Sequence, residues 1–193
     1  RFACRGEGDS DCRFEDADLE PRVADVAAVV AATRRAHPDI SDVSLVGLRF
    51  GAMLAALAAA RLKNVDRLVM WDPVSAQALL RINLAGQLSA FKKVVEGREK
   101  LLERMAGGGT VNIEGYGLTG VFARQISSIR LVNHIATFPG RVLILQPGQE
   151  GTAPRPDIHG LQTARPDAVV QSVPEQPFWK ETKTFFQRAD ALV

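Results

Sequence analysis

The sequence predicts an α/β fold with a mostly parallel sheet flanked by helices. Short apolar runs typical of buried strands alternate with longer segments whose apolar residues recur at helical spacing. Residues 43–52 combine both patterns, because they read as a buried strand, a sharp glycine-flanked turn and the start of an Ala-rich helix. With 193 residues, of which 46% are hydrophobic and 24% charged, the chain is long enough for one substantial core.

The first half of the chain supplies clear helix and strand patterns. Residues 5–12 form a turn-rich loop, and residues 18–36 carry apolar positions at helical spacing until His37 and Pro38 end the pattern. Residues 43–46 predict a strand, residues 52–62 an apolar helix and residues 66–71 a second strand. Strands that alternate with helices favour parallel pairing.

The rhythm changes after Asp72 and Pro73. Residues 75–105 predict a long charged helical stretch without a strand, ended by three glycines, which we interpret as a cap or lid insertion at about 75–110 within one domain spanning 1–193. The remaining predictions are a short strand and turn at 110–116, a helix at 118–131, strands at 141–146 and 169–173, and a closing helix at 178–192. We interpret the segment between the last two strands as a loop.

Charge and cysteine content exclude several classes of protein. The formal net charge of +2 gives no reason to expect a nucleic-acid partner, and the longest apolar run, residues 52–60, is far shorter than a bilayer-spanning helix. Cys4 and Cys12 form no metal-ligand pattern, and no cofactor motif is present, so we expect free thiols, no cofactor and no metal in a cytoplasmic protein. Because the chain begins with Arg1 rather than Met, we also expect that N-terminal residues are missing.

The turn at residues 47–51 has the spacing of a nucleophile elbow. In the G-x-S-x-G turn the central serine is held in a strained conformation, and the flanking glycines let strand and helix approach closely. Gly47 and Gly51 keep that spacing, but Arg49 stands at the centre. A guanidinium stays protonated and offers no lone pair, so it cannot form an acyl-enzyme.

The order of elements resembles the second half of an α/β-hydrolase. Residues 5–10 are similar to the R-G-x-G-x-S turn after that family's fourth strand, which would make Arg1 and Phe2 the stub of that strand. The elbow, the strand end at 71–74, the turn at 115–116 and residues 177–179 are similar to the hydrolase-like proteins associated with the bacterial exosortase A system. The resemblance implies a sheet that lacks its N-terminal strands and the loop that supplies an oxyanion-hole amide.

The resemblance also places the catalytic triad, and this sequence departs from it at every position. The nucleophile falls on Arg49, and the acid falls on the loop at 147–151, where Glu150 or Gln149 would align. The histidine falls on the loop at 174–179, which contains no histidine. Without that base, even a serine at position 49 would lack a proton acceptor.

Substitute catalytic residues are weak candidates. His37 and His134 fit structural roles at helix ends, whereas His159 lies in the segment that faces the site in this fold, where a mobile loop could bring it near Glu150. Ser75 reads most simply as a helix N-cap, Ser10 as a turn residue, and Cys4 lies in a segment of unknown environment.

These observations lead to three hypotheses. The first is a hydrolase-fold accessory protein that has lost serine-hydrolase activity and binds a small anionic, acyl or sugar ligand through Arg49, beside the amides of Phe50 and Gly51, with Asp72 or Glu150 as counter-charge. The second is an active esterase or acyl transferase that uses Ser75 or Ser10 with His159. The third is a structural subunit whose open sheet and charged insertion dock a protein partner.

Overall fold

The computed structural model describes residues 1–75, 98–113 and 116–175. The chain divides into two compact units. One unit contains Arg1–Ile40 and Ser75–Arg130, and the other contains Ser41–Val74 and Leu131–Val193, each over its described residues. Of the helical stretch predicted at 75–105, residues 98–105 lie in a helix (α4, Arg98–Ala106), whereas residues 76–97 and most of the helix predicted at 178–192 lie outside the described residues. The domain boundary with its cap insertion stays a prediction.

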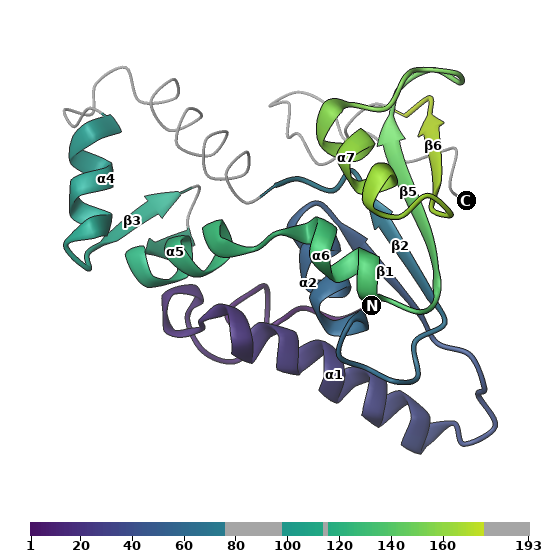
Figure 1. The fold of residues 1–193 in the computed structure, drawn as a ribbon. Helices are drawn as coiled ribbons and strands as arrows, with labels where there is room; N and C mark the ends of the chain where they lie inside the picture. Colours follow the sequence, from purple (N-terminus) through teal and green to yellow (C-terminus); the bar gives the residue numbers. More distant parts are fainter. Residues whose placement is uncertain (76–97, 114–115, 176–193) are drawn as a thin grey trace. The chain divides into compact units, whose positions relative to one another are not determined.

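The second unit is built on a four-stranded parallel sheet (Figure 1). Its strands, in the spatial order β1-β2-β5-β6, are β1 (Ser44–Leu48), β2 (Arg67–Trp71), β5 (Arg141–Pro147) and β6 (Val169–Val173). Over the described residues, three helices accompany it: α2 (Phe50–Ala59), α6 (Leu131–Thr137) and α7 (Pro156–Ala164). Helix α2 packs against β1 and β2, and α6 packs against both α2 and α7. The prediction of a mostly parallel sheet flanked by helices is confirmed.

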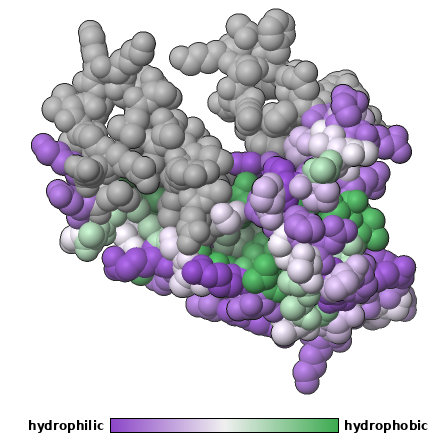
Figure 2. Space-filling model, turned by 45° about the horizontal axis from the view of Figure 1, so that its top comes forward, coloured by the Kyte–Doolittle hydropathy of each residue, from purple (hydrophilic) through white to green (hydrophobic). Residues whose placement is uncertain are grey.

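The register of the strands separates two faces of this sheet. Leu45, Leu68 and Val142 share one register row and are buried. The next row places Val46, Val69, Leu143 and Val169 on the opposite face, because side chains alternate along each strand. Val46 is 67% exposed and Val169 is 59% exposed. The outer strands therefore present valines to solvent. Hydrophilic and hydrophobic areas lie side by side on the face of the described residues that Figure 2 shows.

The first unit is organised around a buried arginine. Its elements are η1 (Phe14–Asp16), α1 (Leu19–Ala36), α4 (Arg98–Ala106), the antiparallel pair β3 (Thr110–Ile113) and β4 (Tyr116–Thr119), and α5 (Gly120–Ser128). Arg22 on α1 is 0% exposed, and its guanidinium lies 4.1 Å from the Phe14 ring centroid. It donates to Glu7 Oε1 at 2.9 Å and to the carbonyl of Arg5 at 3.0 Å. Arg22 therefore anchors the N-terminal loop to α1.

Several sequence-based boundaries were wrong. The single helix predicted at 118–131 is instead the end of β4, helix α5 and the start of α6, because the Thr119 side chain caps α5 by accepting from Phe122 N at 3.1 Å. The segment at 156–164, predicted as a loop, is helix α7. Arg1 and Phe2 form no strand, since no described strand pairs with them, and Phe2 is 44% exposed.

Candidate functional site

The turn between β1 and α2 holds Arg49 in an unusual backbone conformation. Its φ is 55° and its ψ is −114°, a region that L-residues rarely occupy and that costs about 1–3 kcal/mol. Arg49 N donates to the carbonyl of Trp71 at 2.9 Å, and Arg49 O accepts from Ala52 N at 3.1 Å. These bonds fix the chain as it leaves β1 and enters α2. Strand β2 and helix α2 therefore hold Arg49 in its strained conformation.

The two glycines of this turn have different reasons to be there. A Cβ on Gly47 would lie 2.3 Å from Gly51 O and 2.6 Å from Ala52 Cα, so only glycine lets β1 approach the first turn of α2. A Cβ on Gly51 would meet nothing within 4 Å. The close approach of strand and helix expected from the sequence is therefore present. Of the two positions, only position 47 requires glycine for it.

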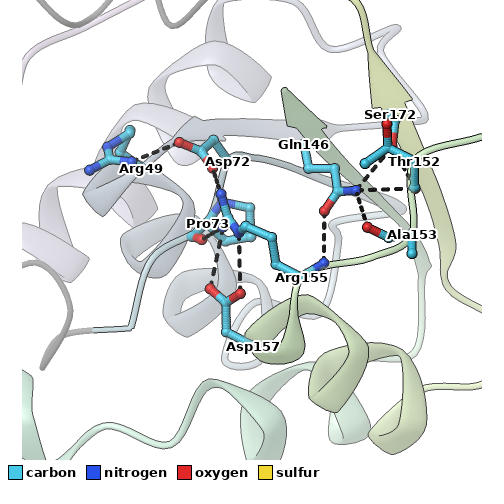
Figure 3. A network of polar contacts seen from close by, with 9 residues as sticks. All are labelled: Arg49, Asp72, Pro73, Gln146, Thr152, Ala153, Arg155, Asp157 and Ser172. Carbon is cyan, nitrogen blue, oxygen red and sulfur yellow. Dashed lines mark hydrogen bonds and ion pairs between the residues drawn. The ribbon is translucent and has the colours of Figure 1, made fainter. Parts of the chain in front are cut away.

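Asp72 lies opposite Arg49 at the end of the neighbouring strand. Its side chain is 4% exposed, and Oδ2 accepts from Arg49 Nη1 at 2.7 Å (Figure 3). Asp72 N donates to Leu145 O at 2.7 Å, which extends the ladder between β2 and β5 beyond the end of β2. Of the two counter-charges considered for Arg49, Asp72 forms the ion pair.

A second guanidinium, which sequence reasoning missed, binds the same carboxylate. Arg155 Nη1 donates to Asp72 Oδ1, and Arg155 Nη2 donates to Pro73 O at 2.9 Å. Arg155 Nε also donates to Asp157 Oδ1 at 3.2 Å. Burial disfavours the charged guanidinium, but the hydrogen bonds to Asp72 and Asp157 outweigh it and raise the pKa of Arg155.

A signal for Arg155 was present in the sequence. Pro156 followed by Asp157 is typical of the first turn of a helix, because proline is preorganised for that position and an acidic side chain favours the positive end of the helix dipole. Arg155 is the residue before that turn, at the N-cap of α7. A helix prediction at 156–164 would have placed Arg155 near the carboxyl ends of the strands.

Buried Gln146 shapes the loop that carries Arg155. Its side chain lies on β5, and the residue is 1% exposed. Gln146 Oε1 accepts from Arg155 N at 3.1 Å, while Nε2 donates to Ala153 O at 3.1 Å and to Ser172 Oγ at 3.0 Å (Figure 3). One amide thus ties the loop after β5 to strand β6.

Glu150 and His159 are not brought to Arg49. Glu150 is exposed, and His159 lies on the exposed side of α7 rather than in a mobile loop. Neither side chain has a hydrogen bond or ion pair with any residue over the part of the chain that the structure describes. A Glu150–His159 pair is therefore not formed there.

The remaining nucleophile candidates are not hydrogen-bonded to a histidine over the described residues. Ser10 Oγ donates to the carbonyl of Ala3 at 3.0 Å, which is a turn contact. Ser75 is exposed. Cys4 is buried, and burial is the main cause that raises the pKa of its thiol to about 11. A thiol with that pKa stays protonated at neutral pH and is a poor nucleophile.

The other two histidines lie at helix ends, as expected. His37 is the C-cap of α1, where its N–H donates to Thr33 O at 2.9 Å. His134 lies in the last turn of α6, and burial together with the charge of Arg61 lowers its pKa. Within the ranges that the structure describes, no three His, Cys, Asp or Glu side chains are grouped so that they could hold a metal ion, and no helix is long and apolar enough to span a membrane.

Comparison with known proteins identifies the fold. No protein-family model and no curated protein matches the sequence. Among solved structures, Est1E from Butyrivibrio proteoclasticus with bound ferulic acid is similar over 88% of this chain and 64% of its own, with 18% identity and a TM-score of 0.63. The α/β-hydrolase GrgF from Penicillium is similar over 88% of this chain and 68% of its own, with 16% identity and a TM-score of 0.58. The chain thus spans less than two thirds of Est1E, and it has part of the α/β-hydrolase fold.

Proposed function

We propose that this chain is an α/β-hydrolase-fold protein that has lost serine-hydrolase activity and binds a small anion through Arg49. One observation carries the proposal: a guanidinium occupies the strained turn between β1 and α2, at the carboxyl ends of the strands. In open parallel sheets, ligands bind at this edge. The proposal places Arg49 at the position of the family's nucleophile.

The charges around Arg49 support an anionic ligand. Arg49 and Arg155 both bind Asp72, so two guanidiniums share one buried carboxylate. Asp157 is the fourth charge of the cluster; its side chain is 42% exposed and that of Arg155 is 38% exposed, so solvent screens both and the four formal charges sum to zero. The N-terminus of α2 adds positive partial charge beside Arg49. A carboxylate or phosphate would balance this partial charge.

The shape of arginine supports the same ligand class. A guanidinium is planar and has five donors, and in Arg49 it is Nη1 that pairs with Asp72. The Arg49 side chain is 21% exposed and therefore accessible from solvent. Planar carboxylate and phosphate groups are the partners that a guanidinium binds in two-pronged geometry. The amides of Phe50 and Gly51 at the start of α2 are the proposed second set of donors.

Anion binding is tested by thermal melts in the presence of phosphate or acetate, with chloride at matched ionic strength as control. Saturation at 100 times Kd stabilises a protein by about 2.7 kcal/mol, which corresponds to a rise in Tm of roughly 5–10 °C at this size. Arg49→Gln should abolish the rise. Arg67→Gln is the matched control, because Arg67 lies on the same sheet and its contact to Asp42 is 3.8 Å long. Equal responses of Arg49→Gln and the parent would overturn the proposal.

The active-enzyme hypothesis is tested separately by incubation with a fluorophosphonate probe and intact-mass measurement. We expect no adduct, since the described residues contain no paired serine and histidine. One stoichiometric serine adduct would refute the loss of activity and identify the nucleophile by peptide mapping. The subgroup associated with the bacterial exosortase A system belongs to the same proposal and rests on the sequence resemblance, and the proposed cytoplasmic location rests on the two free cysteines.

The exposed valines favour a second candidate function, in which the chain is a structural subunit that docks a protein partner. Val46 and Val169 lie in one register row across the sheet, on the outer strands, and both are more than half exposed. Solvent-exposed apolar area on a parallel sheet is unusual, because such sheets are covered on both faces. Light scattering of the parent and of Val46→Lys would test this function, with a loss of assembly expected for the variant if it holds.

A further inference from the structure

The loop after β5 and the strand β6 enclose a groove that the Arg49 cluster does not use. Its volume is about 490 Å³, within the range of roughly 300–1,000 Å³ that is typical of small-molecule sites. Residues 150–154 form one side, residues 170–172 of β6 form the other, and Gln162 of α7 contributes from a third direction. All of these segments belong to the unit built on the parallel sheet.

The walls of this groove are held by hydrogen bonds that centre on the buried Gln146 side chain. Gln146 Nε2 donates to Thr152 O at 3.4 Å, to Ala153 O at 3.1 Å and to Ser172 Oγ at 3.0 Å. Ser172 Oγ in turn donates to Thr152 O at 3.0 Å. Because the loop side and the strand side share the Gln146 amide, their separation is fixed before any ligand arrives. A preorganised site loses less conformational entropy on binding.

The lining has a distinct chemical character. Its polar side chains include two amides, two hydroxyls and one carboxylate, from Gln162, Gln171, Thr152, Ser172 and Glu150, and its lining residues include no Lys or Arg. Over the described ranges, Glu150, Gln162 and Gln171 have no side-chain hydrogen bond to another residue. Val170, Pro154 and Pro174 add apolar surface.

From this arrangement we propose that the groove is a second binding site, for a neutral, hydroxyl-rich ring such as a pyranose. Each ring hydroxyl both donates and accepts, which matches amide side chains that do the same. The C–H face of such a ring fits the apolar surface of proline and valine. An anion is disfavoured because Glu150 is the only charged lining residue among those described.

Three sugars with the same ring but different charge test this site. Titration of isotope-labelled protein with N-acetyl-D-glucosamine, D-glucosamine and D-glucuronate, followed by amide NMR shifts, reports binding residue by residue. We expect N-acetyl-D-glucosamine to shift the amide signals of Gly151, Val170 and Ser172 with a Kd of about 1–10 mM. D-glucuronate should bind at least about tenfold more weakly.

Variants separate this site from the Arg49 cluster. Gln171→Ala should weaken N-acetyl-D-glucosamine about two- to tenfold through loss of one hydrogen bond, with an unchanged Tm because the side chain is exposed. Arg49→Gln, which tests the anion site, should leave this affinity unchanged. Shifts with D-glucosamine alone that vanish in Glu150→Gln would reduce the site to one ion pair and overturn the proposal. Tightest binding of D-glucuronate, or no shift with any of the three sugars, would overturn it equally.

Discussion

Arg49 and Asp72 meet at 2.7 Å where two adjacent parallel strands end. The register pairs Leu48 with Trp71, so the next residue of each strand faces the other across the same edge of the sheet. Both residues have positive φ, 55° for Arg49 and 43° for Asp72. The ion pair therefore joins the two points at which the chain turns sharply out of the sheet, and it links the electrostatics of the site to its backbone strain.

Asp72→Asn should destabilise the fold by roughly 2 kcal/mol. The change keeps the size of the side chain, and asparagine tolerates the left-handed backbone, so it isolates the loss of negative charge between Arg49 and Arg155. Removing one partner of a buried pair costs about 3–5 kcal/mol, but the two guanidiniums here are partly solvated, which lowers the expected cost. Urea unfolding measures the difference.

The control for this variant is Asp157→Asn. The Asp157 side chain is 42% exposed and contacts the same Arg155, so its loss should change the free energy of unfolding by no more than about 0.5 kcal/mol. Equal destabilisation by the two variants would mean that burial of Asp72 does not determine its contribution.

Arg49→Gly should be at least as stable as Arg49→Gln, although it removes more atoms. Both variants lose the ion pair with Asp72, but glycine reaches φ 55° without a Cβ penalty. In Arg49→Gly, relief of about 1–3 kcal/mol of backbone strain favours the folded state. The greater conformational entropy of glycine favours the unfolded chain by about 0.5–1 kcal/mol, which offsets part of that gain. Chemical denaturation of the pair gives the difference directly, and a glycine variant less stable by 1 kcal/mol or more would show that the turn is unstrained.

The sequence predicted the core of the second unit because each of its strands is a short, mostly apolar run. The boundaries of β6 match the prediction and those of β1, β2 and β5 differ from it by one or two residues, since a buried parallel strand leaves a plain signal. Helix α7 was missed because its apolar residues are few, with only Ile158 and Leu161 buried. Periodicity fails where a helix contributes so little to the core.

The candidate site was predictable only in part for a related reason. Arg49 was found because the glycines on either side of it indicate a turn. Asp72 was found because it directly follows a predicted strand. The Pro156 and Asp157 that follow Arg155 signal the start of a helix, but they do not point to Asp72. Gln146 within an apolar strand gives no signal, and only the fold brings it to Ser172. Contacts between residues more than 20 positions apart are set by tertiary packing, which local patterns do not encode.

Gly47→Ala should destabilise the fold by about 3 kcal/mol or more, whereas Gly51→Ala should be neutral or slightly stabilising. The Cβ added at position 47 would lie 2.3 Å from Gly51 O and 2.5 Å from Gly51 C, so β1 or α2 would have to move. At position 51 the Cβ enters open space in the first turn of a helix, where alanine is favoured over glycine by up to about 1 kcal/mol. Equilibrium unfolding of both variants provides the comparison, and similar effects at the two positions would contradict the close approach.

Cys4 and Cys12 should react with a thiol reagent at very different rates. Cys12 is exposed, whereas Cys4 is buried with a pKa raised to about 11, so at pH 8 only about one Cys4 thiol in a thousand is ionised. In the native protein, the reagent should therefore label one thiol quickly and the second only on unfolding, and Cys12→Ser should remove the fast phase.

The raised pKa of Cys4 also makes the stability of the fold depend on pH in the alkaline range. Because the folded state holds the Cys4 proton more tightly than the unfolded chain, whose pKa is near 9, its contribution is complete below pH 9 and is lost as the pH rises through about 11. Cys4→Ala should flatten the alkaline decline of the unfolding free energy in this window, and an unchanged decline in that variant would show that Cys4 ionises as easily in the folded protein as in the unfolded chain.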